Sequence, residues 1–254
     1  MMTEMFWFQN LLLFWFGLSL LVFVLLFFLS APYGRHARKG WGPNIPSTVG
    51  WTVMELPAVV IPLVLFAISS RNHNPVLWTF LLMWEAHYIH RTFIYPYRMR
   101  MQGKTMAISI AAMAFVTNLG IDYLNARWIF TLGPEYSLSW FWDPRFIIGT
   151  TMFVVGFAIN RHSDSILRNL RKPGETGYKI PQGGWYRWVS SPNYTGELIE
   201  WTGWAIATWS LPGLAFALWS FSNLAPRALS NHQWYKEKFP DYPPERKALI
   251  PFLW

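Results

Sequence analysis

The chain has 254 residues, of which 53% are hydrophobic and 19% aromatic, while charged side chains make up only 13%. This composition excludes an ordinary soluble domain and favours a protein embedded in a lipid bilayer. Its 21 lysines and arginines outnumber 13 acidic residues, which gives a net charge of +8. The basic residues lie in short loops between apolar segments, and this distribution favours binding of lipid headgroups or a phosphate-bearing ligand over binding of nucleic acid. The absence of cysteine excludes disulfides, thiolate metal sites and cysteine nucleophiles.

The first apolar segment, residues 6–29, predicts a membrane-spanning helix. Crossing the hydrocarbon core takes roughly 20 mostly apolar residues. The segment follows Glu4 and has no basic front end, which favours a retained span over a cleaved secretory signal. Further candidate spans follow in chain order at residues 51–68, 76–95, 106–123 and 146–159.

The last apolar segment, residues 198–224, is too long for one ordinary span. Pro212 and Gly213 lie in its middle, where proline removes a helix hydrogen bond and glycine relaxes the backbone. This pattern predicts two short helices joined by a tight turn, with one long kinked helix as the alternative. The sequence therefore predicts an all-α membrane protein with seven transmembrane helices, in a single domain that occupies residues 1–254.

Basic residues predict the orientation of these spans, because they collect on the cytoplasmic side of a bacterial inner membrane or an endoplasmic-reticulum membrane. With the N-terminus outside and the C-terminus cytoplasmic, the cytoplasmic segments contain the basic residues at 35–39, 91–104, 161–187 and 227–247. The basic residues of the opposite loops are only Arg71, Arg127 and Arg145. The charges of the last two are predicted to be balanced by the nearby acidic residues Asp122, Glu135 and Asp143. We therefore expect a multi-pass protein with this orientation.

Ionisable side chains within the spans mark candidate sites, because each one costs at least ~2.5–3.5 kcal/mol at membrane depth. Glu55 is either an interfacial carboxylate near the end of its span or a buried carboxyl that faces a cavity. The next span has a polar face that could line a cleft. The residues on this face are Glu85, Tyr88, Arg91, Thr92 and Tyr95.

His87 and His90 flank that face at a spacing that can ligate a metal ion. No set of histidines and carboxylates of the zinc or di-iron type completes such a site in the sequence. We therefore predict that the protein has no metal site and that both histidines are hydrogen-bonded structural residues.

A second polar face follows the span at residues 146–159. Asn160, Asp164, Arg168 and Arg171 share one side of a helix. Carboxylates accept hydrogen bonds from sugar hydroxyls and guanidinium groups match phosphate oxygens, so the face fits a ribose followed by a phosphate. The same spacing also fits a cytoplasmic helix end with ion pairs and headgroup contacts.

A polar, glycine-bearing loop at residues 178–192 leads into the next helix. Asn193, Glu197 and Glu200 lie on one face of that helix, and glycine in the loop lets backbone approach a ligand closely. No Gly-x-Gly-x-x-Gly motif follows a strand, so a nucleotide would be held by helix ends and loops in a non-Rossmann site.

Several of these segments carry a family resemblance. They are Glu-Leu-Pro at 55–57, His-Tyr-Ile-His-Arg-Thr-Phe at 87–93, Arg-Lys-Pro-Gly-Glu at 171–175, Ile-Pro-Gln-Gly-Gly at 180–184, Gly-Glu-Leu-Ile-Glu-Trp at 196–201 and Asp-Tyr-Pro-Pro-Glu-Arg-Lys-Ala-Leu-Ile-Pro-Phe at 241–252. From about residue 51 to the end, the chain resembles the steroid 5α-reductase family, whose wider relatives include polyprenol reductase and trans-2-enoyl-CoA reductase. The two upstream motifs favour the steroid branch.

The resemblance implies a seven-helix fold, NADPH bound on the cytoplasmic side and a substrate that enters from the lipid. By position, Glu55 and Tyr88 would hydrogen-bond the 3-oxo group of the substrate. The cofactor would be held by Asn160, Asp164, Arg171, Tyr178, Asn193, Glu197, Arg227 and Tyr235, to which we add Arg168 and His232. Residues 1–125 would mainly form the substrate cavity and residues 145–254 mainly the NADPH site. Met54 and Ala111 depart from the pattern of animal members, which affects the expected substrate preference and phosphate contacts.

The expected reaction is the reduction of the Δ4 double bond of a 3-oxo-Δ4-steroid to a 5α-reduced 3-oxosteroid. Hydride adds to C5 while Tyr88 and a protonated Glu55 polarise the carbonyl, and the α-carbon receives a proton from water or a nearby acid. We expect a monomer that contacts membrane lipids. The alternatives are an enoyl or polyprenol reductase of the same superfamily, a lipid or prenyl methyltransferase that uses S-adenosylmethionine, and a proton-coupled transporter.

Overall fold

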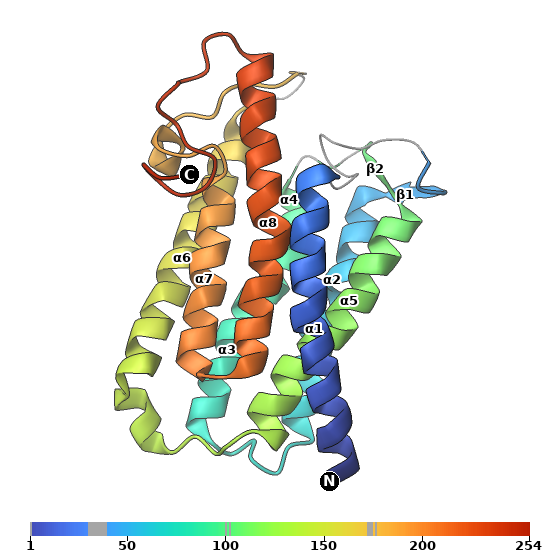
Figure 1. Cartoon of the computed structure of the whole chain (residues 1–254), viewed down its shortest axis with the longest axis vertical. Helices are drawn as coiled ribbons and strands as arrows, with labels where there is room; N and C mark the ends of the chain where they lie inside the picture. Colours follow the sequence, from blue (N-terminus) through green and yellow to red (C-terminus); the bar gives the residue numbers. More distant parts are fainter. Residues whose placement is uncertain (1, 30–39, 100, 102, 172–174, 176) are drawn as a thin grey trace.

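The computed structural model describes residues 2–29, 40–99, 101, 103–171, 175 and 177–254. Of the basic residues predicted to face the cytoplasm, Arg35, Arg38, Lys39, Arg100 and Lys172 lie outside the described residues, as do Pro173 and Gly174 of the motif at 171–175. The described part is an all-α bundle whose long helices run roughly along one axis (Figure 1).

The long helices match the predicted segments in number and order within the described residues. They are α1 (Met2–Phe28), α2 (Ser47–Ala67), α3 (Pro75–Ile89), α5 (Ile108–Arg127), α6 (Pro144–Asn169), α7 (Pro192–Thr208) and α8 (Leu211–Lys238). A π-helix, η2 (His90–Ile94), joins α3 to the short α4 (Tyr95–Arg98), and a second, η3 (Trp128–Leu132), extends α5. The connections contain the antiparallel strands β1 (Asn44–Pro46) and β2 (Thr105–Ala107) and the 3-10 helices η4 (Leu138–Trp142) and η5 (Gly184–Arg187).

The break inside residues 198–224 is confirmed as two helices. α7 ends at Thr208, because the next residue, Trp209, has a left-handed φ of 43°. Ser210 then caps α8 by accepting a hydrogen bond from the backbone N–H of Gly213 at 3.1 Å, and Pro212 occupies the first turn, where its missing N–H costs nothing. Both α6 and α8 continue beyond their predicted apolar ends because their polar residues keep helical periodicity outside the hydrophobic belt.

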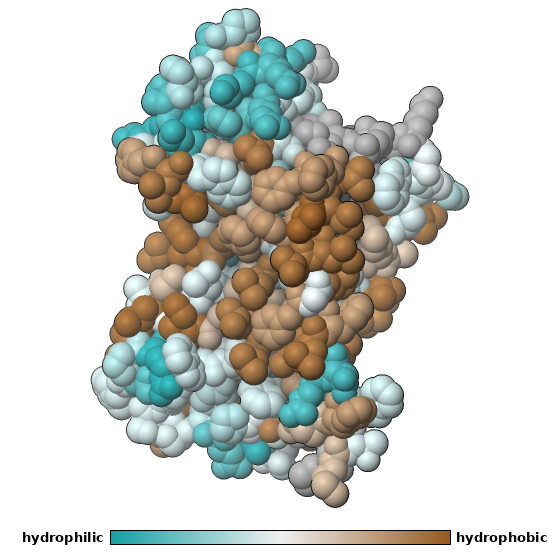
Figure 2. Space-filling model, viewed as in Figure 1, coloured by the Kyte–Doolittle hydropathy of each residue, from teal (hydrophilic) through white to brown (hydrophobic). Residues whose placement is uncertain are grey.

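The surface has the pattern of a membrane protein. An apolar belt covers the middle of the bundle and polar residues gather at both ends (Figure 2). Among the described residues, three helical segments are long and apolar enough to span a bilayer by themselves: α1, α2 and α5 with its π-helical extension. α6 and α8 have lower mean hydropathy because their polar residues face the bundle interior or extend past the belt.

The two termini lie at opposite ends of the bundle (Figure 1). At the N-terminal end three arginines are paired with carboxylates. Arg71 contacts Glu135 at 3.3 Å, Arg127 contacts Glu4 at 2.7 Å and Arg145 contacts Asp143 at 2.7 Å. The prediction that Asp122 and Glu135 balance the charges of Arg127 and Arg145 was therefore wrong. Asp122 is fully buried inside the bundle, and Glu135 forms an ion pair with Arg71.

Glycine pairs bring α6 and α7 into backbone contact. A Cβ atom at Gly156 would lie 2.5 Å from the carbonyl oxygen of Gly196, and one at Gly196 would lie 2.5 Å from the backbone nitrogen of Asn160. Gly149 and Gly203 repeat this arrangement two turns away. Small residues of this kind let helix backbones approach closely in membranes. The close approach places the polar ends of α6 and α7 side by side.

Candidate functional site

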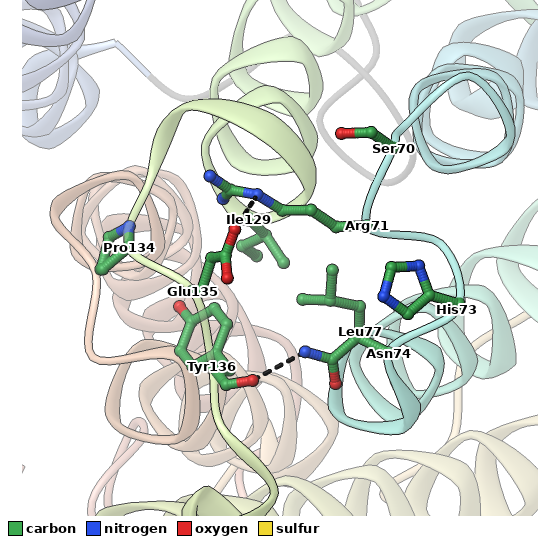
Figure 3. Close-up of a pocket in the computed structure, with 9 residues that line it drawn as sticks. All are labelled: Ser70, Arg71, His73, Asn74, Leu77, Ile129, Pro134, Glu135 and Tyr136. Carbon is green, nitrogen blue, oxygen red and sulfur yellow. Dashed lines mark hydrogen bonds and ion pairs between the residues drawn. The ribbon is translucent and has the colours of Figure 1, made fainter.

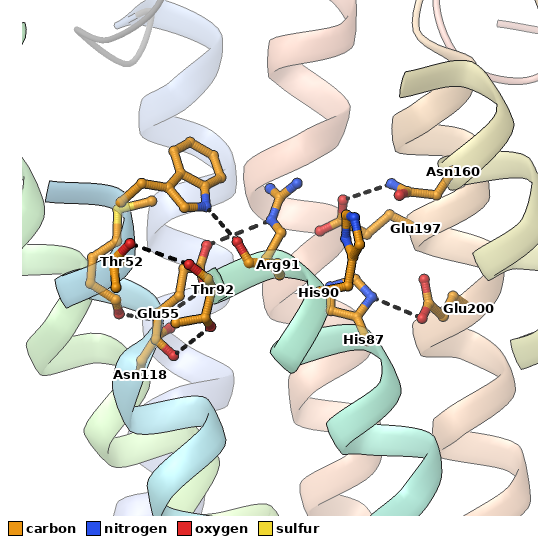
Figure 4. Close-up of polar contacts among 12 residues, drawn as sticks. Thr52, Glu55, His87, His90, Arg91, Thr92, Asn118, Asn160, Glu197 and Glu200 are labelled. Carbon is orange, nitrogen blue, oxygen red and sulfur yellow. Dashed lines mark hydrogen bonds and ion pairs between the residues drawn. The ribbon is translucent and has the colours of Figure 1, made fainter. Parts of the chain in front are cut away.

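Glu55 lies inside the bundle, on the face of α2 that packs against α3 and α5. Its side chain is only 12% exposed. One carboxylate oxygen lies 3.6 Å from Nε of Arg91, and the other accepts a hydrogen bond from Nδ2 of Asn118 at 3.5 Å (Figure 4). The Glu55 carboxyl is therefore mostly enclosed by neighbouring helices, and its orientation toward a cavity stays a prediction.

Tyr88 is buried on α3 and is enclosed by aromatic rings. Its ring stacks on Trp201 with centroids 5.7 Å apart and contacts Trp84 at 5.0 Å. Tyr88 lies one helical turn before Arg91, whose guanidinium contacts Glu55 at 3.6 Å.

Arg91 occupies the centre of this interior, where the π-helix η2 interrupts the regular turn of α3. Figure 4 shows its guanidinium between Glu55 and Glu197. The Arg91 group stacks at 4.7 Å on the ring of Trp51, and the Trp51 indole donates to the backbone oxygen of Arg91 at 3.1 Å. An extra residue in a helical turn re-aims side chains, and such turns are frequent at functional sites. The sequence placed Arg91 on the polar face but gave no sign of this central position.

Four of the predicted cofactor residues form one hydrogen-bonded group between α6 and α7. Asn160 donates to the backbone oxygen of Asn193 at 3.0 Å and to the Glu197 carboxylate at 3.3 Å. Asn193 in turn donates to Asp164 at 3.3 Å. Asn160 and Asp164 are buried. Amide and carboxylate groups held in this way can bind hydroxyl and carboxamide groups of a ligand.

His87 on α3 and Glu200 on α7 form a buried hydrogen-bonded pair. Nδ1 of His87 and a carboxylate oxygen of Glu200 lie 2.9 Å apart, with side chains only 5% and 0% exposed. The reading of His87 as a hydrogen-bonded structural residue is confirmed. No sequence pattern indicated that Glu200 is its partner, because the pair forms only where α3 and α7 come together.

The last turns of α8, beyond residue 224, contain three more of the predicted cofactor residues. They lie at the C-terminal end of the bundle. Nε of Arg227 donates to the hydroxyl of Tyr194 at 2.9 Å. His232 lies 2.6 Å from Ser190, and Tyr235 stacks on Tyr242 at 5.3 Å with the rings 11° from parallel. Burial lowers the pKa of His232, and the nearby Lys236 and Lys247 lower it further, so its ring is neutral at physiological pH.

The remaining predicted residues lie outside this hydrogen-bonded group. Arg168 donates to Ser165 at 2.9 Å, and the partly exposed Arg171 donates to the backbone oxygen of Gly177 at 2.9 Å. Tyr178 is 49% exposed and packs edge-on against Trp234. These three side chains lie at the polar surface of the C-terminal end of the bundle. A charged ligand group bound there would stay partly solvated.

A cavity of about 140 Å³ lies at the opposite end of the bundle, between the α2–α3 loop and the loop that follows η3. Figure 3 shows Arg71 and Glu135 paired across it, with His73 and Asn74 beside them. None of the predicted site residues lines this cavity. In the part of the chain that the structure describes, no three histidine or carboxylate side chains converge as a set of metal ligands.

Comparisons with known proteins agree with the motifs. The family model described as 3-oxo-5-alpha-steroid 4-dehydrogenase matches residues 104–254. Steroid 5-alpha-reductase DET2 of Arabidopsis thaliana is 46% identical over 238 residues, covering 91% of this chain and 90% of the relative. The 3-oxo-5-alpha-steroid 4-dehydrogenase 1 of Bos taurus is 42% identical, covering 93% of each chain, and that of Homo sapiens is 44% identical, covering 87% and 85%. The similarity therefore extends to the N-terminal side of residue 51, where the motifs had placed its start.

Proposed function

This chain belongs to the 3-oxo-5-alpha-steroid 4-dehydrogenase family, and from that premise we propose that it reduces the Δ4 double bond of 3-oxo-Δ4-steroids with NADPH. The observation that supports the proposal is the contact of Glu55 with Arg91, one helical turn after Tyr88, together with the hydrogen-bonded group of Asn160, Asp164, Asn193 and Glu197 between α6 and α7. The names of the relatives support a steroid substrate over the enoyl and polyprenol substrates of the wider superfamily and over methyl transfer.

In the proposed reaction, negative charge develops on the 3-oxo oxygen as hydride reaches C5. The Tyr88 hydroxyl and a protonated Glu55 donate hydrogen bonds to that oxygen and stabilise the enolate more than the ketone. In the proposed reaction, the burial of Glu55 outweighs the contact with Arg91 at 3.6 Å, and the carboxyl therefore keeps its proton.

The residues at the C-terminal end have the chemistry that a dinucleotide requires. Asn160, Asp164, Asn193 and Glu197 offer amide and carboxylate groups for the carboxamide and sugar hydroxyls, and Arg168, Arg171 and Arg227 offer guanidinium groups for the phosphates. Tyr178, His232 and Tyr235 complete the set. When bound, NADPH supplies the hydride, and the protein orients the ring and excludes water. Residues 145–254 would thus mainly bind the cofactor and residues 1–125 mainly the steroid.

The proposed membrane arrangement has seven spans, the N-terminus outside and the C-terminus in the cytoplasm. The opposite positions of the termini support an odd number of spans (Figure 1). The three arginines at the N-terminal end are neutralised by carboxylates, whereas the basic residues of the other end are in excess, as the cytoplasmic side requires. We expect a monomer that takes its substrate from the bilayer.

The test is to incubate the purified protein with NADPH and a panel of 3-oxo-Δ4-steroids and to measure product masses. We expect a gain of two hydrogens on at least one steroid and a deuterium at C5 when the transferable hydride of NADPH is deuterated. Reduction of polyprenols or 2-enoyl thioesters with no steroid reduced would contradict the proposed substrate. A mass gain of one methylene group with S-adenosylmethionine would contradict the reaction.

Arg171→Ala should weaken NADPH binding by roughly tenfold or more while NADH binding changes little, because we expect its guanidinium to contact the 2′-phosphate in a charge-assisted hydrogen bond. Dissociation constants for the two cofactors, measured by fluorescence quenching at fixed salt, check this. Arg145→Ala, at the opposite end, is the matched control. Equal weakening of NADPH and NADH would remove Arg171 from the 2′-phosphate.

A further inference from the structure

α3 packs against α7 through large aromatic side chains. The Trp84 ring lies 5.4 Å from that of Trp201 and 5.1 Å from that of Trp204. The Phe80 ring lies 5.8 Å from that of Trp204. Aromatic pairs are favourable over centroid distances of about 4.5–7 Å, so these contacts hold the two helices together without fixing how far one has slid along the other.

A hydrogen bond between His87 and Glu200 crosses the same contact. Nδ1 of the imidazole and a carboxylate oxygen lie 2.9 Å apart. A hydrogen bond weakens steeply outside a narrow range of distance and angle, so this bond specifies the register of α3 on α7 where the rings do not. Loss of either partner would leave a polar group buried and unpaired, which destabilises a fold.

The pair lies beside Tyr88, the residue proposed to polarise the steroid carbonyl. His87 precedes Tyr88 on α3, and Glu200 precedes Trp201 on α7. The Tyr88 ring stacks on Trp201 with centroids 5.7 Å apart, and the His87 ring makes a T-shaped contact with the same indole at 4.7 Å. A shift of α3 along α7 would therefore break the hydrogen bond and move Tyr88 together with His87.

Glu200 is also tied to the proposed cofactor site. Gly156 of α6 packs directly on the Glu200 backbone, where a Cβ atom would meet the Glu200 nitrogen. One turn earlier on α7, Glu197 accepts the hydrogen bond of Asn160, as Figure 4 shows. The position of Glu200 is thus fixed with respect to the group between α6 and α7, and its hydrogen bond to His87 fixes α3 with respect to the same group.

We propose that His87 and Glu200 are positioning residues of the reductase, which fix Tyr88 with respect to the nicotinamide ring of the cofactor. This inference rests on the proposed function. The steroid carbonyl is held on the α3 side and the hydride donor on the α6–α7 side, so the register between α3 and α7 decides the distance from the hydride to C5. A displacement of about 1 Å in such a distance can lower a rate by about 10²-fold. In this role neither residue touches the substrate.

The double variant His87→Phe, Glu200→Met tests this role, because it removes both partners and leaves neither of them unpaired. The phenyl ring keeps the contact with Trp201, and methionine matches the length of glutamate. Replacement of both partners by apolar groups of similar shape can be nearly neutral for stability. We expect the unfolding temperature in detergent, the NADPH dissociation constant and the KM for the steroid to stay near wild type, while the single-turnover rate of reduction falls by about 10²-fold.

The single variants separate positioning from a merely structural role. His87→Phe and Glu200→Met should each lower both the unfolding temperature and the rate, since each leaves a buried partner unpaired. Glu200→Gln keeps a group that can hydrogen-bond Nδ1 of His87 and should keep most of the wild-type rate. If the pair serves only stability, the double variant regains the wild-type rate together with the wild-type unfolding temperature, and that result would overturn the inference.

If the double variant does not fold, Glu200→Gln and Glu200→Met decide the question, with rates expressed per NADPH-bound protein. We expect the Gln variant to be fast and the Met variant slow, because only the former keeps the hydrogen bond. Equal rates in the two would refute the positioning role.

Asn125→Leu with Trp204→Phe is the matched control. It removes another buried hydrogen bond of α7, from the Trp204 indole to Asn125 on α5 at 3.0 Å, one turn beyond Glu200. We expect this variant to keep the wild-type single-turnover rate, and an equal loss of rate in both double variants would contradict the inference. A wild-type protein that reduces no steroid would instead contradict the proposed function, on which the inference rests.

Discussion

Glu55→Gln should lower kcat by roughly 10²- to 10³-fold and leave the affinity for NADPH near its wild-type value, because it removes a donor to the developing oxyanion. A protonated carboxyl gives a stronger hydrogen bond than an amide to an oxygen that becomes negative in the transition state. The glutamine keeps the size of the side chain and can still accept from Asn118, so the packing of α2 on α5 should persist. Single-turnover reduction of a steroid at saturating NADPH measures the effect.

Glu135→Gln is the matched control for Glu55→Gln. Glu135 also lies beside an arginine, Arg71, but its side chain is 74% exposed and lies at the opposite end of the bundle. We expect this variant to have wild-type turnover, since exposed ion pairs contribute little. Wild-type turnover in Glu55→Gln itself would show that Glu55 does not polarise the substrate carbonyl.

The helices could largely be predicted from the sequence because apolar length is a local property. Each predicted span corresponds to a helix, and Pro212 and Gly213 correctly placed the break between α7 and α8. The helix ends were predicted less well. α6 continues to Asn169 because its last turns are polar but still helical, and hydropathy gives no signal there. The number of helices that cross the bilayer stays a prediction.

The candidate site was predicted in its residue types but not in its connections. Single segments indicated Glu55, Tyr88 and the polar face of α6, since charges within apolar helices are expensive. The pairing of His87 with Glu200 and the burial of Asp122 depend on which helices pack together. No local pattern contains that information, and Asp122 was for this reason counted among the loop carboxylates that balance Arg127 and Arg145. The roles of these residues in binding and catalysis stay predictions.

Close packing of α6 on α7 should control the cofactor site, and Gly156→Ala should abolish NADPH binding. Alanine normally stabilises an exposed helix by about 1 kcal/mol relative to glycine. Here the three atoms nearest to the added Cβ atom are backbone atoms of α7, including the carbonyl oxygen of Gly196 at 2.5 Å, so the helices must move apart at a cost of about 1–3 kcal/mol. That movement separates Asn160 from Glu197 and Asn193.

The experiment compares Gly156→Ala with Gly17→Ala, in which a Cβ atom on α1 meets nothing within 4 Å. Both variants add the same methyl group to a membrane helix, so the difference between them isolates the α6–α7 contact. We expect Gly17→Ala to keep the wild-type unfolding midpoint and NADPH affinity in detergent, and Gly156→Ala to lose NADPH binding and unfold at lower temperature. Equal NADPH affinity in Gly156→Ala and Gly17→Ala would show that cofactor binding does not depend on the close packing of α6 on α7. In that case Asn160, Asn193 and Glu197 are not part of the cofactor site.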